Sequence, residues 1–101
     1  MDIKASATIT SYTDKLIIKS GFHELRKVIV TVLIDSLDKS VTLEGYKNAT
    51  GNNIEFTGDL HTSGLDSLLL LDDIIGLKID IILQSISNLK FVVSNKSNRR
   101  N

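Results

Sequence analysis

The residues best suited to chemistry lie in one polar segment, which reads Gly-Asp-Leu-His-Thr-Ser-Gly-Leu-Asp from Gly58 to Asp66. It contains Asp59, His61 and Ser63. A histidine oriented by a carboxylate and close to a hydroxyl is the minimal arrangement for nucleophilic catalysis. Catalytic triads, however, are normally assembled from distant parts of a chain, and no oxyanion hole is recognisable here. We therefore interpret the segment as a polar connection and predict that the chain is not an enzyme.

The same segment holds the candidate metal ligands. His61 with Asp59 and Asp66, or His23 with Glu24, would offer nitrogen and oxygen atoms to a divalent ion. The two histidines are far apart, cysteine is absent and no His-x-x-x-His spacing occurs. The sequence therefore predicts no metal site and no cofactor.

Nucleic-acid binding has a weak basis in the charge pattern. Twelve basic and twelve acidic residues cancel, so no global field attracts a polyanion. The C-terminal segment carries a basic cluster of Lys96, Arg99 and Arg100, which would suit a phosphate backbone. Aromatic residues, which stack on bases, make up only 5% of the chain. Binding through this tail and the first hairpin, which carries Lys15 and Lys19, is kept as the alternative function.

The amino-acid composition excludes several further classes of protein. Without cysteine, a disulfide scaffold and a thiolate metal site are excluded. The start lacks the pattern of a signal peptide, and no apolar stretch approaches the length of about 18 residues that indicates a membrane helix. We expect a cytoplasmic or virion protein that does not enter a membrane. Proline, one of the residues that keep sheet edges from pairing with other chains, is also absent.

A similar sequence pattern occurs twice in the chain and predicts two β-hairpins. Residues Val30 to Lys39 read Val-Thr-Val-Leu-Ile-Asp-Ser-Leu-Asp-Lys, and residues Ile79 to Asn88 read Ile-Asp-Ile-Ile-Leu-Gln-Ser-Ile-Ser-Asn. In each, an apolar run is followed by a short polar turn, and a second apolar stretch follows, Val41 to Leu43 or Leu89 to Val93. This order is typical of a hairpin. Any two such hairpins would look alike, so we infer no internal duplication.

The N-terminal part predicts another pair of strands. Residues 3–10 alternate between apolar and polar side chains, as in a half-buried strand. Residues 11–14 are turn formers, and residues 16–18 would make the return strand, which Gly21 ends.

The segment from residue 22 to residue 37 is ambiguous. Its large apolar residues fall at helical spacing, whereas residues 28–32 are all β-branched and favour a strand. We predict a strand over residues 26–34, with a helix over residues 22–37 as the alternative.

The remaining segments complete the predicted fold. Residues 41–46 and 54–57 flank a loop rich in asparagine and glycine, which predicts a third hairpin. Residues 65–75 are predicted as a short helix, with a buried strand as the alternative. Residues 94–101 have almost no apolar content and are predicted to form a disordered polar and basic tail, which leaves residues 1–93 as one domain.

Several segments are apolar on both faces, and this pattern motivates the functional prediction. Two-sided burial requires a second layer, which a second sheet or another protein would supply. The residues predicted to make such an interaction are Val28, Val30, Val32, Ile79, Ile81 and Leu83.

The sequence therefore predicts a mainly β fold, an antiparallel sandwich or partly open barrel of about six to seven strands. An α+β fold with a helix at residues 22–37 on the sheet is the alternative. The predicted function is that of a non-enzymatic structural or protein-interaction module. It would act through strand edges and apolar surface, and would associate with itself or with another protein by strand addition.

Overall fold

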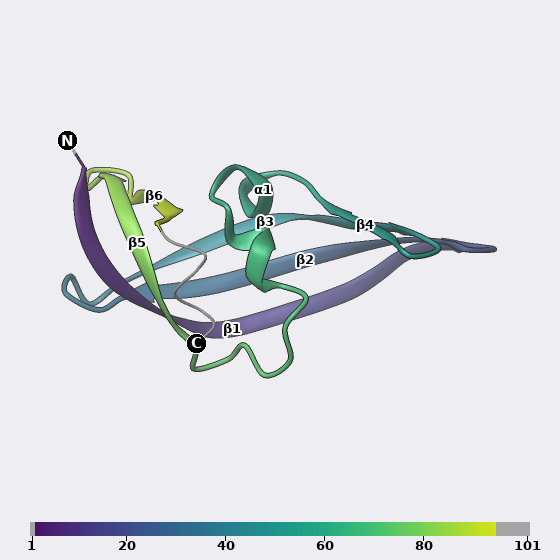
Figure 1. The fold of residues 1–101 in the computed structure, drawn as a ribbon, viewed down its shortest axis with the longest axis horizontal. Helices are drawn as coiled ribbons and strands as arrows, with labels where there is room; N and C mark the ends of the chain where they lie inside the picture. The colour runs from purple at the N-terminus through teal and green to yellow at the C-terminus, as the bar shows by residue number, and fades with distance from the viewer. Residues whose placement is uncertain (1, 95–101) are drawn as a thin grey trace.

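Six antiparallel strands form one curled sheet, a half-barrel, in the computed structural model, which describes residues 2–94 (Figure 1). The strand order is β4-β3-β2-β1-β5-β6. The elements are β1 (Ile3–Ser20), β2 (His23–Ile34), β3 (Lys39–Thr50), β4 (Asn53–Phe56), α1 (Asp59–Thr62), the 3-10 helix η1 (Leu65–Leu68), β5 (Lys78–Ser85) and β6 (Lys90–Val93). The predicted mainly β fold is confirmed. Of the two predicted architectures, the sheet is the partly open barrel and not a two-layered sandwich.

The strands differ greatly in how far they are paired. β1 pairs with β2 from Ala7 opposite Ile34 to Ser20 opposite His23, whereas β5 pairs with β1 only as far as Thr8. The far parts of β1, β2, β3 and β4 therefore project beyond the curled region, as Figure 1 shows. We call this projection, formed by residues 10–27 and 46–56, the finger.

The turn predicted at residues 11–14 is wrong, because β1 runs without interruption through that segment. Serine, threonine and tyrosine are compatible with a strand, and here each of these residues is held opposite a residue of β2. An irregularity between Ile9 and Ser11 takes up one extra residue as a β-bulge, and a second lies between Leu16 and Ile18. The chain instead reverses at Gly21, whose φ of 58° is one that glycine adopts without strain.

The ambiguous segment is a strand, so the helical alternative over residues 22–37 is wrong. β2 alternates along its second half between fully buried and partly buried residues, as expected for a strand with one face in the core. The two hairpins predicted from the repeated pattern are confirmed as β2–β3 and β5–β6, and the third as β3–β4.

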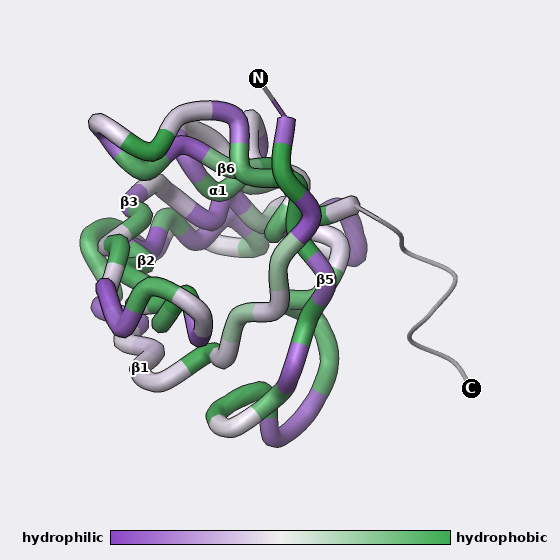
Figure 2. Tube along the Cα trace, turned by 90° about the vertical axis from the view of Figure 1, so that its left-hand side faces the viewer, coloured by the Kyte–Doolittle hydropathy of each residue, from purple (hydrophilic) through white to green (hydrophobic). Residues whose placement is uncertain are grey.

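The core lies inside the curl and is closed by the segment between β4 and β5. Figure 2 shows the strands curling around this interior, with β5 alternating between hydrophilic and hydrophobic residues. Leu60 of α1, Leu65 and Leu68 of η1, and Leu69 are buried against the inner face. The predicted helix over residues 65–75 is limited to the 3-10 turn Leu65–Leu68, and α1 forms in a segment interpreted as a polar connection.

Asp35 joins three elements where the curl begins. It lies just after β2, and its carboxylate accepts hydrogen bonds from the Thr8 hydroxyl of β1 and from the Lys78 ammonium of β5, each at 3.0 Å. The hydrogen bond from Lys78 is the main cause that lowers the pKa of Asp35. These contacts fix β5 against β1 at the point where their pairing ends.

Candidate interaction surface

The polar segment around His61 is only partly assembled in the way that catalysis would need. His61 Nδ1 lies 2.9 Å from Asp66 Oδ2, and the His61 side chain is 70% exposed. Ser63 is buried, and its hydroxyl accepts a hydrogen bond from the backbone N–H of Leu65. Asp59 is exposed in the first turn of α1. The structure thus brings His61 and Asp66 together, while the serine hydroxyl is used within its own turn.

Within residues 2–94 no group of three or more histidine, aspartate or glutamate side chains could hold a metal ion. His23 lies on the finger, where its Nε2 is 2.7 Å from Oδ1 of Asn48. Its neighbour Glu24 instead accepts hydrogen bonds from Lys19 and Arg26.

The six residues predicted to make an interaction lie in the core. Val28, Val30, Val32 and Ile81 are fully buried, and Ile79 and Leu83 are exposed by at most 6%. The second layer that their pattern requires is supplied by the curl of the same sheet and by the leucines of α1 and η1. In the folded chain these side chains therefore present no surface to another protein.

The basic residues of the tail lie outside the described part of the chain, and most of those on the first hairpin are already paired with carboxylates. Lys96, Arg99 and Arg100 lie outside the described residues. Lys19 and Arg26 pair with Glu24, Arg26 also pairs with Asp14, and Lys27 pairs with Glu44. Lys15 and Lys47 are the finger's two lysines without an ion pair among residues 2–94. The first hairpin therefore offers a polyanion little uncompensated charge.

The most distinctive feature of the surface is a free strand edge on β1. Ile9 donates a backbone hydrogen bond to Leu77 and accepts one from Gly76, so its backbone groups face away from β2. Tyr12, Asp14 and Leu16 occupy the equivalent alternate places in the β1–β2 ladder, and their backbone N–H and C=O groups therefore face the same side.

Beyond Ile9, no strand of residues 2–94 pairs with this side of β1, so the edge is open over residues 10–20. The edge strands β4 and β6 have only four residues each. β4 pairs with β3 only over residues 47–50 and Thr57 bonds to Tyr46, so β3 is open over residues 39–45. The β1 edge is thus the longest unsatisfied row of backbone groups in the described sheet.

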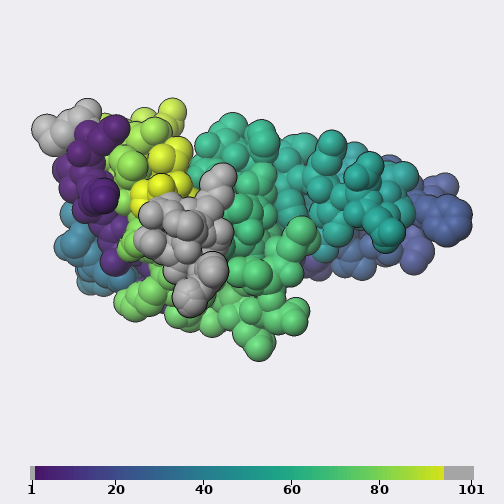
Figure 3. Space-filling model, in the orientation of Figure 1, coloured from purple at the N-terminus to yellow at the C-terminus, as the bar shows by residue number. Residues whose placement is uncertain are grey.

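Apolar side chains gather at the end of the finger. Leu16, Ile17 and Ile18 are about half exposed, and Phe22, in the turn after Gly21, is 87% exposed. In the space-filling view the finger is a narrow projection with little around it (Figure 3). A large side chain held this far from the core contributes little to the fold, and clustered exposed apolar residues are typical of interaction sites.

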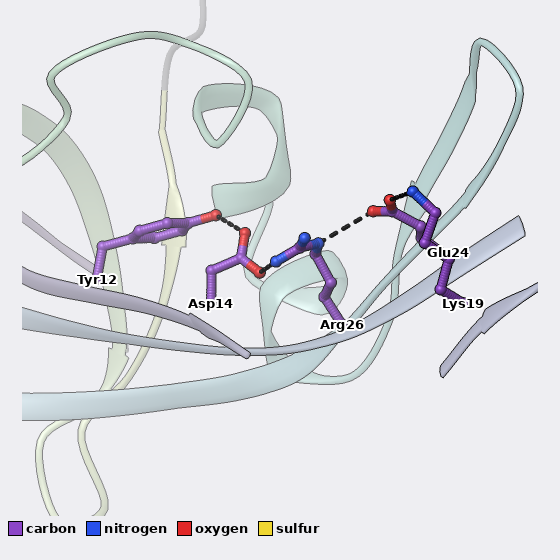
Figure 4. A network of polar contacts seen from close by, with 5 residues as sticks. All are labelled: Tyr12, Asp14, Lys19, Glu24 and Arg26. Carbon is purple, nitrogen blue, oxygen red and sulfur yellow. Dashed lines mark hydrogen bonds and ion pairs between the residues drawn. The ribbon is translucent and has the colours of Figure 1, made fainter. Parts of the chain in front are cut away.

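A polar network covers the inner face of the finger where the apolar core ends. Figure 4 shows Tyr12 donating its hydroxyl to Asp14, Arg26 bridging Asp14 and Glu24, and Lys19 pairing with Glu24. These contacts are 3.0 to 3.1 Å long, and the charged residues that they join alternate between negative and positive along the network. The hydrogen bonds that Glu24 accepts from Arg26 and Lys19 lower the pKa of Glu24. The hydrogen bonds that Arg26 donates to Asp14 and Glu24 raise the pKa of Arg26.

This network makes a prediction for Tyr12. Burial, followed by the hydrogen bond to Asp14, raises its pKa from 10.0 to about 12. Because the folded-state pKa is the higher one, the contribution to stability is complete below pH 10 and is lost as the pH rises through about 12. Tyr12→Phe should lower the free energy of unfolding at neutral pH by about 1 kcal/mol and flatten its alkaline decline.

Ultraviolet titration of phenolate absorbance checks the pKa directly. The chain has two tyrosines, so Tyr46→Phe leaves Tyr12 as the only one that titrates. A titration midpoint of this variant near 10 would show that the Tyr12–Asp14 contact does not persist in solution.

A second apolar surface lies at the base of the finger, in the connection between η1 and β5. Leu70, Leu71 and Ile75 are all at least half exposed there. Residues 69–75, together with Tyr12 of β1 and Lys47 of β3, line an open groove of about 510 Å³. We call this groove, whose lining includes Asp72 and Asp73, the loop groove. It begins beside the point where the free edge of β1 begins, because Gly76 bonds to Ile9.

No helix in the described part of the chain is long and apolar enough to cross a membrane. Comparison of the chain with protein-family models, with curated proteins and with solved structures found no match. The function must therefore be inferred from the surface itself.

Sequence reasoning predicted exposed strand edges without locating the free edge on β1, and it missed the exposed Phe22 and the loop groove. Phe22 had a local signal, since a large aromatic residue directly after a turn glycine has little chance of reaching the core. Leu70 and Leu71 had no such local signal, because the run Leu68 to Leu71 does not reveal which two of its leucines face inward.

Proposed function

We propose that the protein is a non-enzymatic protein-interaction module that acts by strand addition at the free edge of β1. The observation that carries the proposal is the open row of backbone groups over residues 10–20, beside which Leu16, Ile17 and Ile18 are exposed. In strand addition, backbone hydrogen bonds supply affinity, and alternate side chains of the added strand supply specificity. The chain has no proline to block the edge.

The side chains along the edge support this function. Between the two bulges, β1 is regular over residues 11–16, so an added strand finds ladder positions at Tyr12, Asp14 and Leu16. The inner-face side chains at these positions run from the polar Tyr12 and Asp14 to the apolar Leu16, which gives the edge a direction.

Amide hydrogen exchange tests the proposal. In dilute protein we expect the amides of Tyr12 and Asp14 to exchange fast and those of Thr13 and Lys15, which face β2, to exchange slowly. A synthetic peptide of alternating threonine and valine, used as the added strand, should slow the exchange of Tyr12 and Asp14. The same peptide with N-methylated backbone amides should not.

A pair of proline variants provides the control. Leu16→Pro removes an outward N–H and should abolish peptide protection with only a modest loss of stability, because proline is tolerated on an open edge. Lys15→Pro removes an N–H that bonds to β2 and should cost about 3 kcal/mol or more, comparable to proline in a regular element. Slow exchange of Tyr12 and Asp14 in a sample whose native mass is that of a single chain, or equal protection in Leu16→Pro, would contradict the proposal.

A further inference from the structure

We propose that the partner at this edge is a second copy of the chain, paired antiparallel with the first about a two-fold axis at Leu16. The inference rests on the proposed function and adds the identity of the added strand, its register and a second contact. Three observations carry it: the charges along the edge, the place of the loop groove and the exposure of Phe22.

The charges on the edge are complementary to themselves in one register. Asp14, Leu16 and Lys19 all pair with inner-face residues of β2 and so have outward backbone groups and side chains on the same face. A two-fold axis at Leu16 places Leu16 opposite the partner's Leu16. Because the bulge between Leu16 and Ile18 adds one residue to the strand, Asp14 then lies opposite the partner's Lys19 rather than its Ile18. Opposite charges directly across a ladder stabilise it, whereas an axis at Asp14 would place two carboxylates together.

The polar network of Figure 4 fits this register. Within one copy the order along the inner face is Asp14, Arg26, Glu24 and Lys19, with alternating sign. Antiparallel pairing continues the alternation across the dimer, since the negative end of each edge meets the positive end of the other. The side chains of Asp14 and Arg26 remain partly exposed on the inner face, so Asp14 is accessible to a second cation.

The same register brings the two apolar surfaces together. Tyr12 lies one ladder position before Asp14, and it faces the turn at Gly21 and Phe22 of the partner. Tyr12 also lines the loop groove, so the partner's Phe22 reaches Leu70, Leu71 and Ile75. The groove of about 510 Å³ is open and large enough to admit an aromatic side chain. Each copy then covers the other's exposed apolar residues, as an isologous interface requires.

Disulfide trapping tests the register, because the chain has no cysteine of its own. Leu16→Cys places two thiols across the axis, at the Cα separation of about 5.5 Å expected for a hydrogen-bonded pair. That separation is within the range that a disulfide spans. Under mild oxidation this variant should convert almost completely to a covalent dimer. Ile86→Cys, at a somewhat more exposed position in the β5–β6 turn, is the control and should not form a covalent dimer.

The native mass, measured by light scattering on a sizing column, completes the test. The wild-type chain should show twice its 11.1 kDa. Because Phe22 contributes to both halves of the interface, Phe22→Ser should raise the dissociation constant of the dimer at least about 100-fold. Asp14→Lys and Lys19→Asp should each be monomeric alone, and an equimolar mixture should recover the dimer.

A monomer mass at every concentration, or cross-linking of Ile86→Cys as fast as that of Leu16→Cys, would overturn the two-fold pairing. The trapping result stands without the charge variants, should either of them fail to fold. If the chain is monomeric but the threonine-valine peptide still protects Tyr12 and Asp14, the dimer is refuted and strand addition is retained. If the peptide also fails, both proposals fall.

Discussion

Gly45→Ala should lower the free energy of unfolding by at least about 3 kcal/mol, and Gly45→Val should prevent folding. Gly45 lies on the inner face of β3, where the chain crosses on its way from β4 to α1. A Cβ atom built there would lie 1.9 Å from the carbonyl oxygen of Thr57 and 3.2 Å from Cδ1 of Leu60. The oxygen belongs to backbone that is itself hydrogen-bonded to Tyr46, so it cannot move aside as a flexible side chain would.

Chemical denaturation followed by far-ultraviolet circular dichroism measures this effect, with Gly51→Ala as the control. Gly51 has a φ of 59° but open space around its Cβ position, so alanine there should cost only about 1–2 kcal/mol of backbone strain. If the two variants proved equally stable, the segment from Thr57 to Leu60 would not cross β3 in the way described.

Leu68→Ala and Leu70→Ala should differ by several kcal/mol, although the two residues are only two positions apart. Leu68 in η1 is fully buried, and its truncation should cost about 2–5 kcal/mol. Leu70 is 59% exposed, and its truncation should change stability by less than about 0.5 kcal/mol. The loss expected for Leu68→Ala is a large part of the total free energy of unfolding of a domain of this size.

The comparison is made by thermal or urea unfolding at a concentration below that of any self-association, so that only the fold contributes. Equal losses in the two variants would mean that Leu70 packs into the core and that the loop groove does not exist in solution. If the predicted difference is found, the fold does not need an apolar side chain at Leu70. The side chain is then available for the proposed contact with the partner's Phe22.

Strand content could be predicted where the strand preference of the residues is stronger than a competing helical pattern. The β-branched run in residues 28–32 outweighs the helical spacing around it, because a strand gains both from local preference and from burial of alternate residues. The Ser11–Asp14 segment could not be placed in this way. Its residues suit a turn and a strand equally well, and the decision comes from pairing with β2.

The interaction surface could not be predicted because it depends on where other strands end. Val28 and Ile81 are apolar enough for either a core or an interface, and only the curl of the sheet shows that they are core residues. The edge of β1 is open because β5 stops pairing at Thr8, which no local pattern in β1 indicates. Only the general idea of an exposed strand edge followed from the sequence, through the absence of proline.

The central place of β1 in the sheet has a consequence for the order of folding. Its pairing with β2 is local and closes through the tight turn at Gly21, whereas its pairing with β5 joins Ile3 to Leu83. Contacts of such large sequence separation form slowly, since the entropy of closing the long intervening loop is lost before any bond forms. The four-stranded meander from β1 to β4 can therefore assemble first, and the docking of β5 that completes the curl follows as the slower event.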